Sequence, residues 1–87
     1  MYIILCYDVF QKRLAKVHKT VKKYLFPVQK SVFEGDLTEK RLGFLKKELL
    51  QKIDPEKDSI AIYCLKDLSG IVKEEIGNNQ KDDFRFL

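Results

Sequence analysis

The fold is decided by the stretch YIILCYDVFQKRLAKVHKTVKKYLFPVQKSVFE, residues 2–34. Residues 2–8 are a continuous apolar run with β-branched and aromatic side chains, which predicts a buried strand. Residues 11–25 carry apolar side chains at helical spacing and predict an amphipathic helix. Pro27 interrupts this spacing, and the alternating residues 26–34 predict a second strand at a sheet edge, because proline cannot donate to a ladder. The apolar positions of the helix are Leu14, Val17, Val21, Tyr24 and Leu25.

The rest of the chain predicts a second helix followed by strands. This helix begins near Thr38, with Asp36 or Thr38 as its cap, and ends before the Asp54-Pro55 pair. Residues 58–65 are apolar on both faces and predict a buried strand, and residues 70–77 predict a weaker one. The last four residues, FRFL, are a candidate short strand. The core stripe of the second helix is Leu42, Leu45, Leu49 and Ile53.

Strands interspersed with two amphipathic helices predict an α+β fold, which we assign to the ferredoxin-like βαββαβ sandwich with a short extra C-terminal strand. Residues 1–78 form the domain, and residues 79–87 are a tail or short strand available for exchange with a partner chain. Two helices cover only one face of such a sheet, yet the first and third strands are apolar on both faces. The opposite face therefore needs a cover, and a second copy of the chain is the economical one. We expect a homodimer.

Composition limits the class of protein. The chain has 87 residues, of which 45% are hydrophobic, enough for one globular domain with a small core. The apolar run that contains YIILC is too short for a membrane span and lacks signal-peptide flanks. Cys6 and Cys64 lie in apolar strands without zinc-type spacing, which favours a reduced, buried pair and a cytoplasmic location.

Positive charge is concentrated in residues 9–33, which contain seven Lys or Arg and no acid, whereas the net charge of the whole chain is +4. Within the first predicted helix, four lysines recur at i, i+4, i+7 and i+11, opposite the apolar stripe, over about 16 Å of axis. A solvated face usually mixes both signs, so an acid-free stripe favours phosphate binding. The candidate nucleic-acid-binding residues are Lys12, Arg13, Lys16, Lys19 and Lys23.

Asp8 follows the first strand directly and has two interpretations. A carboxylate at the end of a rigid strand suits a hard cation such as Mg²⁺, but an aspartate before a helix often only caps it. A single carboxylate holds Mg²⁺ weakly, whereas two copies meeting at a dimer twofold relieve their repulsion by binding a divalent cation. His18 is more simply a packed or half-exposed histidine than a general base, and Phe44 is a candidate partner contact.

Four segments resemble the CRISPR-associated protein two family: MYIILCYDV, KVHKTVKKY, VQKSVFEGDLT and the LKKEL of the second helix. The resemblance extends from Met1 to about Ile62. It implies a ferredoxin-like homodimer with its sheets packed face to face, in which Asp8 of each chain is the catalytic, metal-binding residue. It also implies a Mg²⁺-dependent endonuclease acting on single-stranded RNA or double-stranded DNA, and an adaptor that bridges the CRISPR integrase and holds duplex DNA.

Three functions therefore follow as hypotheses. One is endonuclease activity at paired Asp8 carboxylates, and another is a DNA-binding adaptor of spacer acquisition, which we rank as the biological role. The alternative is a stand-alone metal-dependent ribonuclease toxin of the virulence-associated type. The stretch between Asp8 and the first helix is short, with Arg13 its only nearby arginine, so the residues do not decide between RNA and DNA cleavage.

Overall fold

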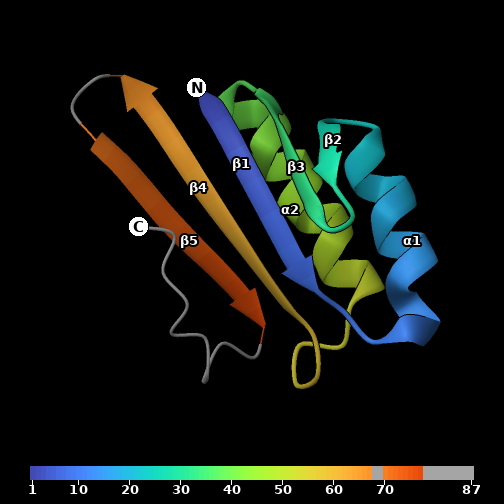
Figure 1. Cartoon of the computed structure of the whole chain (residues 1–87). Coiled ribbons are helices and arrows are strands. Elements are labelled where there is room, and N and C mark those ends of the chain that lie inside the picture. The colour runs from blue at the N-terminus through green and yellow to red at the C-terminus, as the bar shows by residue number, and fades with distance from the viewer. Residues whose placement is uncertain (68–69, 78–87) are drawn as a thin grey trace.

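A computed structural model describes residues 1–67 and 70–77 (Figure 1). Five antiparallel strands form one sheet in the order β2-β3-β1-β4-β5, and both helices lie on the same face of it (Figure 1). The elements in chain order are β1 (Tyr2–Asp8), α1 (Gln11–Lys22), β2 (Phe26–Gln29), β3 (Val32–Asp36), α2 (Glu39–Lys52), β4 (Ser59–Asp67) and β5 (Gly70–Gly77).

The α+β, ferredoxin-like prediction is confirmed, with β1 in the middle of the sheet between β3 and β4. The prediction of a single strand over residues 26–34 is wrong, because the chain reverses at Lys30 and Ser31 and forms the hairpin β2–β3. Neither turn residue is glycine, asparagine or aspartate, so the usual hairpin signal does not appear in the sequence. The edge position expected from Pro27 is confirmed, since β2 is an outer strand.

The core lies between the helices and one face of the sheet. Alternate residues of β1, namely Ile3, Leu5 and Tyr7, are buried beneath the helices, and Phe33 of β3 is fully buried beside them. The predicted stripe of α2 is confirmed, because its members Leu42, Leu45, Leu49 and Ile53 are all buried. Its cap is also confirmed at Thr38, whose hydroxyl accepts from the backbone N–H of Arg41 at 3.1 Å.

The predicted stripe of α1 needs one correction. Leu14 remains 36% exposed, whereas Thr20 is buried among the apolar residues. Thr20 tolerates this position because its hydroxyl donates to the backbone oxygen of Lys16 at 3.0 Å, which satisfies that hydroxyl. Helical spacing identifies the face of a helix that turns inward, but it does not indicate how completely each residue of that face is covered.

The face of the sheet away from the helices remains open in the single chain. Tyr2 and Ile4 of β1 are each 38% exposed, and Leu65 of β4 is 40% exposed. These apolar side chains lie on one continuous face, since Tyr2 is paired with Leu65 and Ile4 with Tyr63. The homodimer stays a prediction that this surface motivates. The expected tail and last strand, residues 79–87, lie outside the described residues.

Neither helix of the described part of the chain is long and apolar enough to cross a membrane.

Candidate active site and nucleic-acid interface

Asp8 is exposed at the last position of β1, opposite Ser59 of β4. It alternates with the buried Tyr7 and therefore projects on the open side of the sheet. The helix-capping interpretation does not describe this aspartate, because the N-cap of α1 is Phe10 and no side chain caps that helix. Within the described residues, no hydrogen bond or ion pair engages the Asp8 carboxylate. It is an exposed anion on a rigid strand end.

An open groove of about 720 Å³ extends from Asp8 along the first turns of α1 to the turn between β2 and β3. Its volume falls within the range of ligand-binding clefts, roughly 300–1,000 Å³. It combines a carboxylate with an ammonium group from Lys30, an amide from Gln11 and a hydroxyl from Ser31. The remaining lining residues are Tyr7, Val9, Leu14, Ala15 and His18.

His18 is half-buried in the wall of this groove, as expected from its position beside the apolar stripe. Its Nδ1 atom lies 3.3 Å from the hydroxyl oxygen of Tyr7. Its ring meets Phe33 edge-on at 5.3 Å between centroids, and Tyr7 stacks on Phe33 at 6.1 Å. Burial raises the pKa of Tyr7. The sequence did not predict that His18 and Asp8 line the same groove, because only the packing of α1 on the sheet brings them together.

One chain does not provide a complete metal site. The described residues contain no cluster of three or more His, Cys, Asp or Glu side chains able to hold an ion. Mg²⁺ prefers octahedral oxygen ligation and is usually bound through one or two carboxylates with several waters. Asp8 alone fits this requirement poorly, and a second Asp8 from a partner chain would improve the fit.

A second aspartate at the same end of the sheet has the opposite environment. Asp58 is fully buried immediately before β4 and accepts hydrogen bonds from Arg13 Nε at 2.5 Å and Nη2 at 2.9 Å. It also accepts from the backbone N–H groups of Phe10 at 2.9 Å and Asp54 at 2.8 Å. Burial acts to raise the pKa of Asp58, but these hydrogen bonds outweigh it and lower the pKa to about 2.

This pair changes the interpretation of Arg13, which the sequence placed among the nucleic-acid-binding residues. Its side chain is only 12% exposed, and its guanidinium group is engaged by Asp58. The pKa of Arg13 is raised, chiefly by this hydrogen bond. Asp58 itself was missed because the sequence shows it only as the first residue of a predicted strand. Its arginine partner is separated from it by 45 residues.

The lysine stripe, which we define as Lys12, Lys16, Lys19 and Lys23, is exposed along α1 and its C-cap. Lys23 forms an ion pair with Glu48 of α2 at 2.6 Å, and the hydroxyl of Tyr24 also donates to Glu48. Hydrogen bonding to Glu48 raises the pKa of Lys23. No ion pair with a described residue engages the other three lysines, so they are the stronger phosphate-binding candidates.

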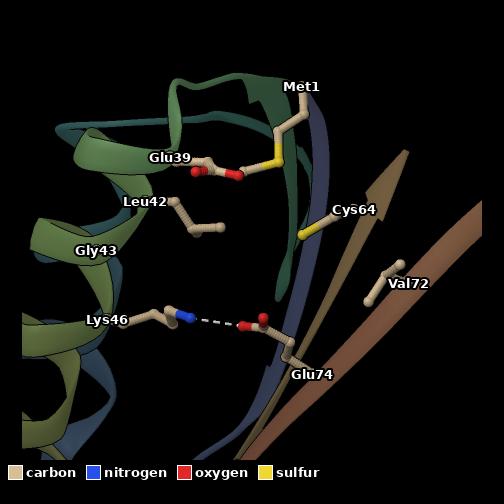
Figure 2. A pocket seen from close by; sticks show the side chains of 8 residues that line it. All are labelled: Met1, Glu39, Leu42, Gly43, Lys46, Cys64, Val72 and Glu74. Atoms are coloured by element: carbon tan, nitrogen blue, oxygen red, sulfur yellow. Dashed lines mark hydrogen bonds and ion pairs between the residues drawn. The ribbon is translucent and has the colours of Figure 1, made fainter. Parts of the chain in front are cut away.

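A second hollow, of about 220 Å³, lies between α2 and the strands β4 and β5 (Figure 2). Lys46 of α2 and Glu74 of β5 form an ion pair across it at 2.6 Å, as Figure 2 shows. Cys64 and Val72 contribute apolar wall on the sheet side. Because its lysine is neutralised by a neighbouring carboxylate, this hollow is a weaker anion site than the groove at Asp8.

Comparisons with known proteins identify the family. The family model described as CRISPR associated protein Cas2 matches residues 1–69. A CRISPR-associated endoribonuclease Cas2 from Thermodesulfovibrio yellowstonii is 45% identical over 84 residues, covering 88% of this chain and 96% of that protein. The Thermotoga maritima protein of the same name is 39% identical over 95% of both chains. A crystal structure of Streptococcus pyogenes Cas2 at pH 6.5 superposes with a TM-score of 0.69 at 38% identity, covering 75% of this chain and 86% of that one. The chain therefore belongs to the CRISPR-associated Cas2 family.

Proposed function

We propose that this protein is a CRISPR endoribonuclease that depends on Mg²⁺ and works as a homodimer, with Asp8 as the catalytic and metal-binding residue. The observation that carries the proposal is the exposed Asp8 carboxylate, which has no described partner and lies at the mouth of the groove. The relatives named above as endoribonucleases support the same activity. Membership of the Cas2 family favours this CRISPR role over the stand-alone toxin.

The dimer supplies what a single chain lacks. If the open sheet faces of two copies pack together, their apolar residues Tyr2, Ile4 and Leu65 become covered, and Asp8 projects on that same side of each sheet. Two carboxylates near the twofold repel each other, and a divalent cation relieves the repulsion. Bound there, Mg²⁺ supplies Lewis-acid polarisation of a phosphoryl oxygen and a more acidic water.

The remaining groove residues act on the RNA itself. The ammonium group of Lys30 attracts a phosphate, and Gln11 and Ser31 offer further donors to phosphate or ribose oxygens. Apolar wall from Leu14 and Ala15 accommodates the flat face of a sugar or base. These side chains therefore bind and orient one stretch of single strand beside Asp8, which lowers the entropic part of the barrier.

The test is metal-dependent cleavage of single-stranded RNA by Asp8→Asn. This change removes the charge and preserves the size, so the variant folds while cleavage in Mg²⁺ falls to the level measured with a chelator. Asp36→Asn is the matched control, because Asp36 is an exposed acid at the opposite end of the sheet. Undiminished cleavage by rigorously purified Asp8→Asn would refute the assignment, and equal loss in both variants would indicate a general charge effect.

A second role, as the DNA-binding adaptor that bridges the CRISPR integrase, is favoured by the lysine stripe. Three exposed lysines without acidic partners among the described residues, Lys12, Lys16 and Lys19, span about two turns of α1. Removing one phosphate contact reduces the slope of log affinity against log salt by about 0.9 for duplex DNA. Alanine at Lys12, Lys16 or Lys19 should flatten this slope, with less effect at Lys23 because Glu48 already pairs with it.

Lys47→Ala is the control for the stripe, since Lys47 is an exposed lysine on the other helix. If Lys47→Ala flattened the salt dependence as much as the changes on α1, DNA would be attracted by the overall positive charge and not bound by the lysine stripe. The adaptor role also requires a partner, so purified integrase and short duplex DNA should form a stable ternary complex with the wild-type protein. The complex should weaken when the stripe is removed, and failure of the wild type to form it would refute the adaptor role.

A further inference from the structure

We propose that Asp58, acting through Arg13 and the backbone of Phe10, is a positioning residue that fixes the backbone position from which the Asp8 carboxylate projects. This inference rests on the proposed catalytic role of Asp8. Asp58 is not among the residues that line the groove. We call the four hydrogen bonds that converge on its carboxylate, from Arg13 (two), Phe10 and Asp54, the Asp58 clamp.

The Asp58 clamp joins residues 10–13 to residues 54–58, two segments that are distant in the sequence. Phe10 belongs to the connection from β1 to α1, Arg13 to the first turn of α1, and Asp54 to the connection from α2 to β4. That last connection is closed on itself, because the backbone N–H of Asp58 donates in return to the backbone oxygen of Asp54 at 2.8 Å. These segments meet at the end of the sheet where β1 terminates (Figure 1).

The clamp restrains the backbone on both sides of Asp8. Its backbone pairs with Ser59, the residue after Asp58, and Phe10 follows it by two residues. No described side chain holds the Asp8 carboxylate, so the backbone on either side sets only the position and direction of its Cα–Cβ bond. A displacement of about 1 Å at a reacting group can cost on the order of a hundredfold in rate. A rigid connection between β1 and α1 would therefore favour catalysis enough to offset the cost of burying the Asp58 carboxylate.

The ionised form of Asp58 is needed for all four bonds. A carboxylate accepts through two oxygens, whereas an asparagine amide offers one accepting oxygen and adds an N–H₂ group that would face the guanidinium donors of Arg13. Asp58→Asn therefore retains the volume but loses about half of the clamp. It also leaves the positive charge of Arg13, only 12% exposed, without a negatively charged partner.

The experiment compares Asp58→Asn and Arg13→Met with Glu48→Gln. The control is matched because Glu48 also joins two elements through side-chain hydrogen bonds, from Lys23 and Tyr24, away from Asp8. Turnover of single-stranded RNA in Mg²⁺ is measured at a temperature where circular dichroism shows each variant folded. We expect kcat to fall by about tenfold or more in Asp58→Asn with KM within about twofold, a smaller fall in Arg13→Met, and no change in Glu48→Gln.

Two readouts do not depend on turnover. Titration with Mn²⁺ followed by electron paramagnetic resonance should give a dissociation constant raised about tenfold in Asp58→Asn and unchanged in Glu48→Gln. Hydrogen exchange at the amide of Phe10, which donates to Asp58, should accelerate in Asp58→Asn and remain unchanged in Glu48→Gln. If Asp58→Asn does not fold, Arg13→Met tests the positioning role instead, because it keeps the hydrogen bonds from the backbone N–H groups of Phe10 and Asp54 to Asp58.

The outcomes separate this inference from the proposed function. Folded clamp variants with wild-type kcat, Mn²⁺ affinity and Phe10 exchange would overturn the positioning role and leave Asp58 as a purely structural residue. A wild-type protein without Asp8-dependent cleavage or Mn²⁺ binding would instead overturn the proposed nuclease, and with it any catalytic purpose for the clamp. Accelerated Phe10 exchange with unchanged kcat would also contradict the positioning role, because the backbone beside Asp8 would then be more mobile without any loss of catalysis.

Discussion

At the scale of single residues, two aspartates at one end of the sheet illustrate how environment divides the same side chain between roles. Asp8 is exposed and has no described partner, whereas Asp58 is fully buried and accepts four hydrogen bonds. A buried carboxylate persists only when it is paired and fully hydrogen-bonded. An exposed carboxylate without a partner, in contrast, is free to take a ligand.

The lowered pKa of Asp58 predicts how stability depends on acid. Its folded pKa of about 2 lies below the ordinary value of 3.8, so the folded state favours the charged form. The resulting stabilisation, about 2 kcal/mol, is complete above the unfolded pKa and is lost as the pH falls toward 2. Chemical unfolding, measured at a fixed protein concentration, should therefore show that the difference in free energy of unfolding between wild type and Asp58→Asn decreases from pH 5 to pH 2. A constant difference over this range would contradict the prediction.

At the scale of elements, the helices and the central strands follow directly from side-chain periodicity. The inward stripe of α2 and the Thr38 cap are local patterns, and the sequence predicted both. The β2–β3 hairpin was missed because its turn at Lys30 and Ser31 carries none of the usual turn residues. The clamp was missed for a different reason. Arg13 and Asp58 are joined only by tertiary packing, which no local pattern records.

Helix α2 contains a glycine whose replacement should stabilise the protein. Gly43 is exposed within the helix, and a Cβ built on it would meet no atom within 4 Å. Alanine lowers the backbone entropy of the unfolded chain at no steric cost, so Gly43→Ala should raise the free energy of unfolding by about 1 kcal/mol. Thermal unfolding would measure this as an increase in Tm.

Gly77 provides the opposing case at the end of β5. Its φ of +97° favours glycine, and a Cβ there would lie 2.1 Å from the backbone oxygen of Asp58. Gly77→Ala should therefore lower Tm by more than Gly43→Ala raises it. An unchanged Tm for Gly77→Ala would mean that the end of β5 can move away from Asp58.

At the scale of the whole molecule, the charge and the apolar surface are segregated. The lysine stripe lies on α1, on the helical side, whereas Tyr2, Ile4 and Leu65 lie on the bare side of the sheet. A second chain on the bare side leaves the stripes of both copies free for nucleic acid. The sequence predicted this division because strands that are apolar on both faces need cover on both. How two chains would be arranged does not follow from the periodicity of one chain.

If the proposed homodimer forms through the bare face, a charge at the centre of that face should not be tolerated. Ile4 is 38% exposed in the single chain and is paired with Tyr63 on one side and Glu34 on the other. If a partner covers it, Ile4→Lys buries an unpaired ammonium group, and the protein should aggregate or unfold.

Leu50→Lys is the control, since Leu50 is 51% exposed on α2, away from that face, and this variant should remain a folded dimer. Analytical ultracentrifugation distinguishes the outcomes. A well-folded Ile4→Lys monomer would show that the chain is stable alone and that the dimer is not obligate, whereas loss of the dimer in Leu50→Lys as well would locate the interface elsewhere.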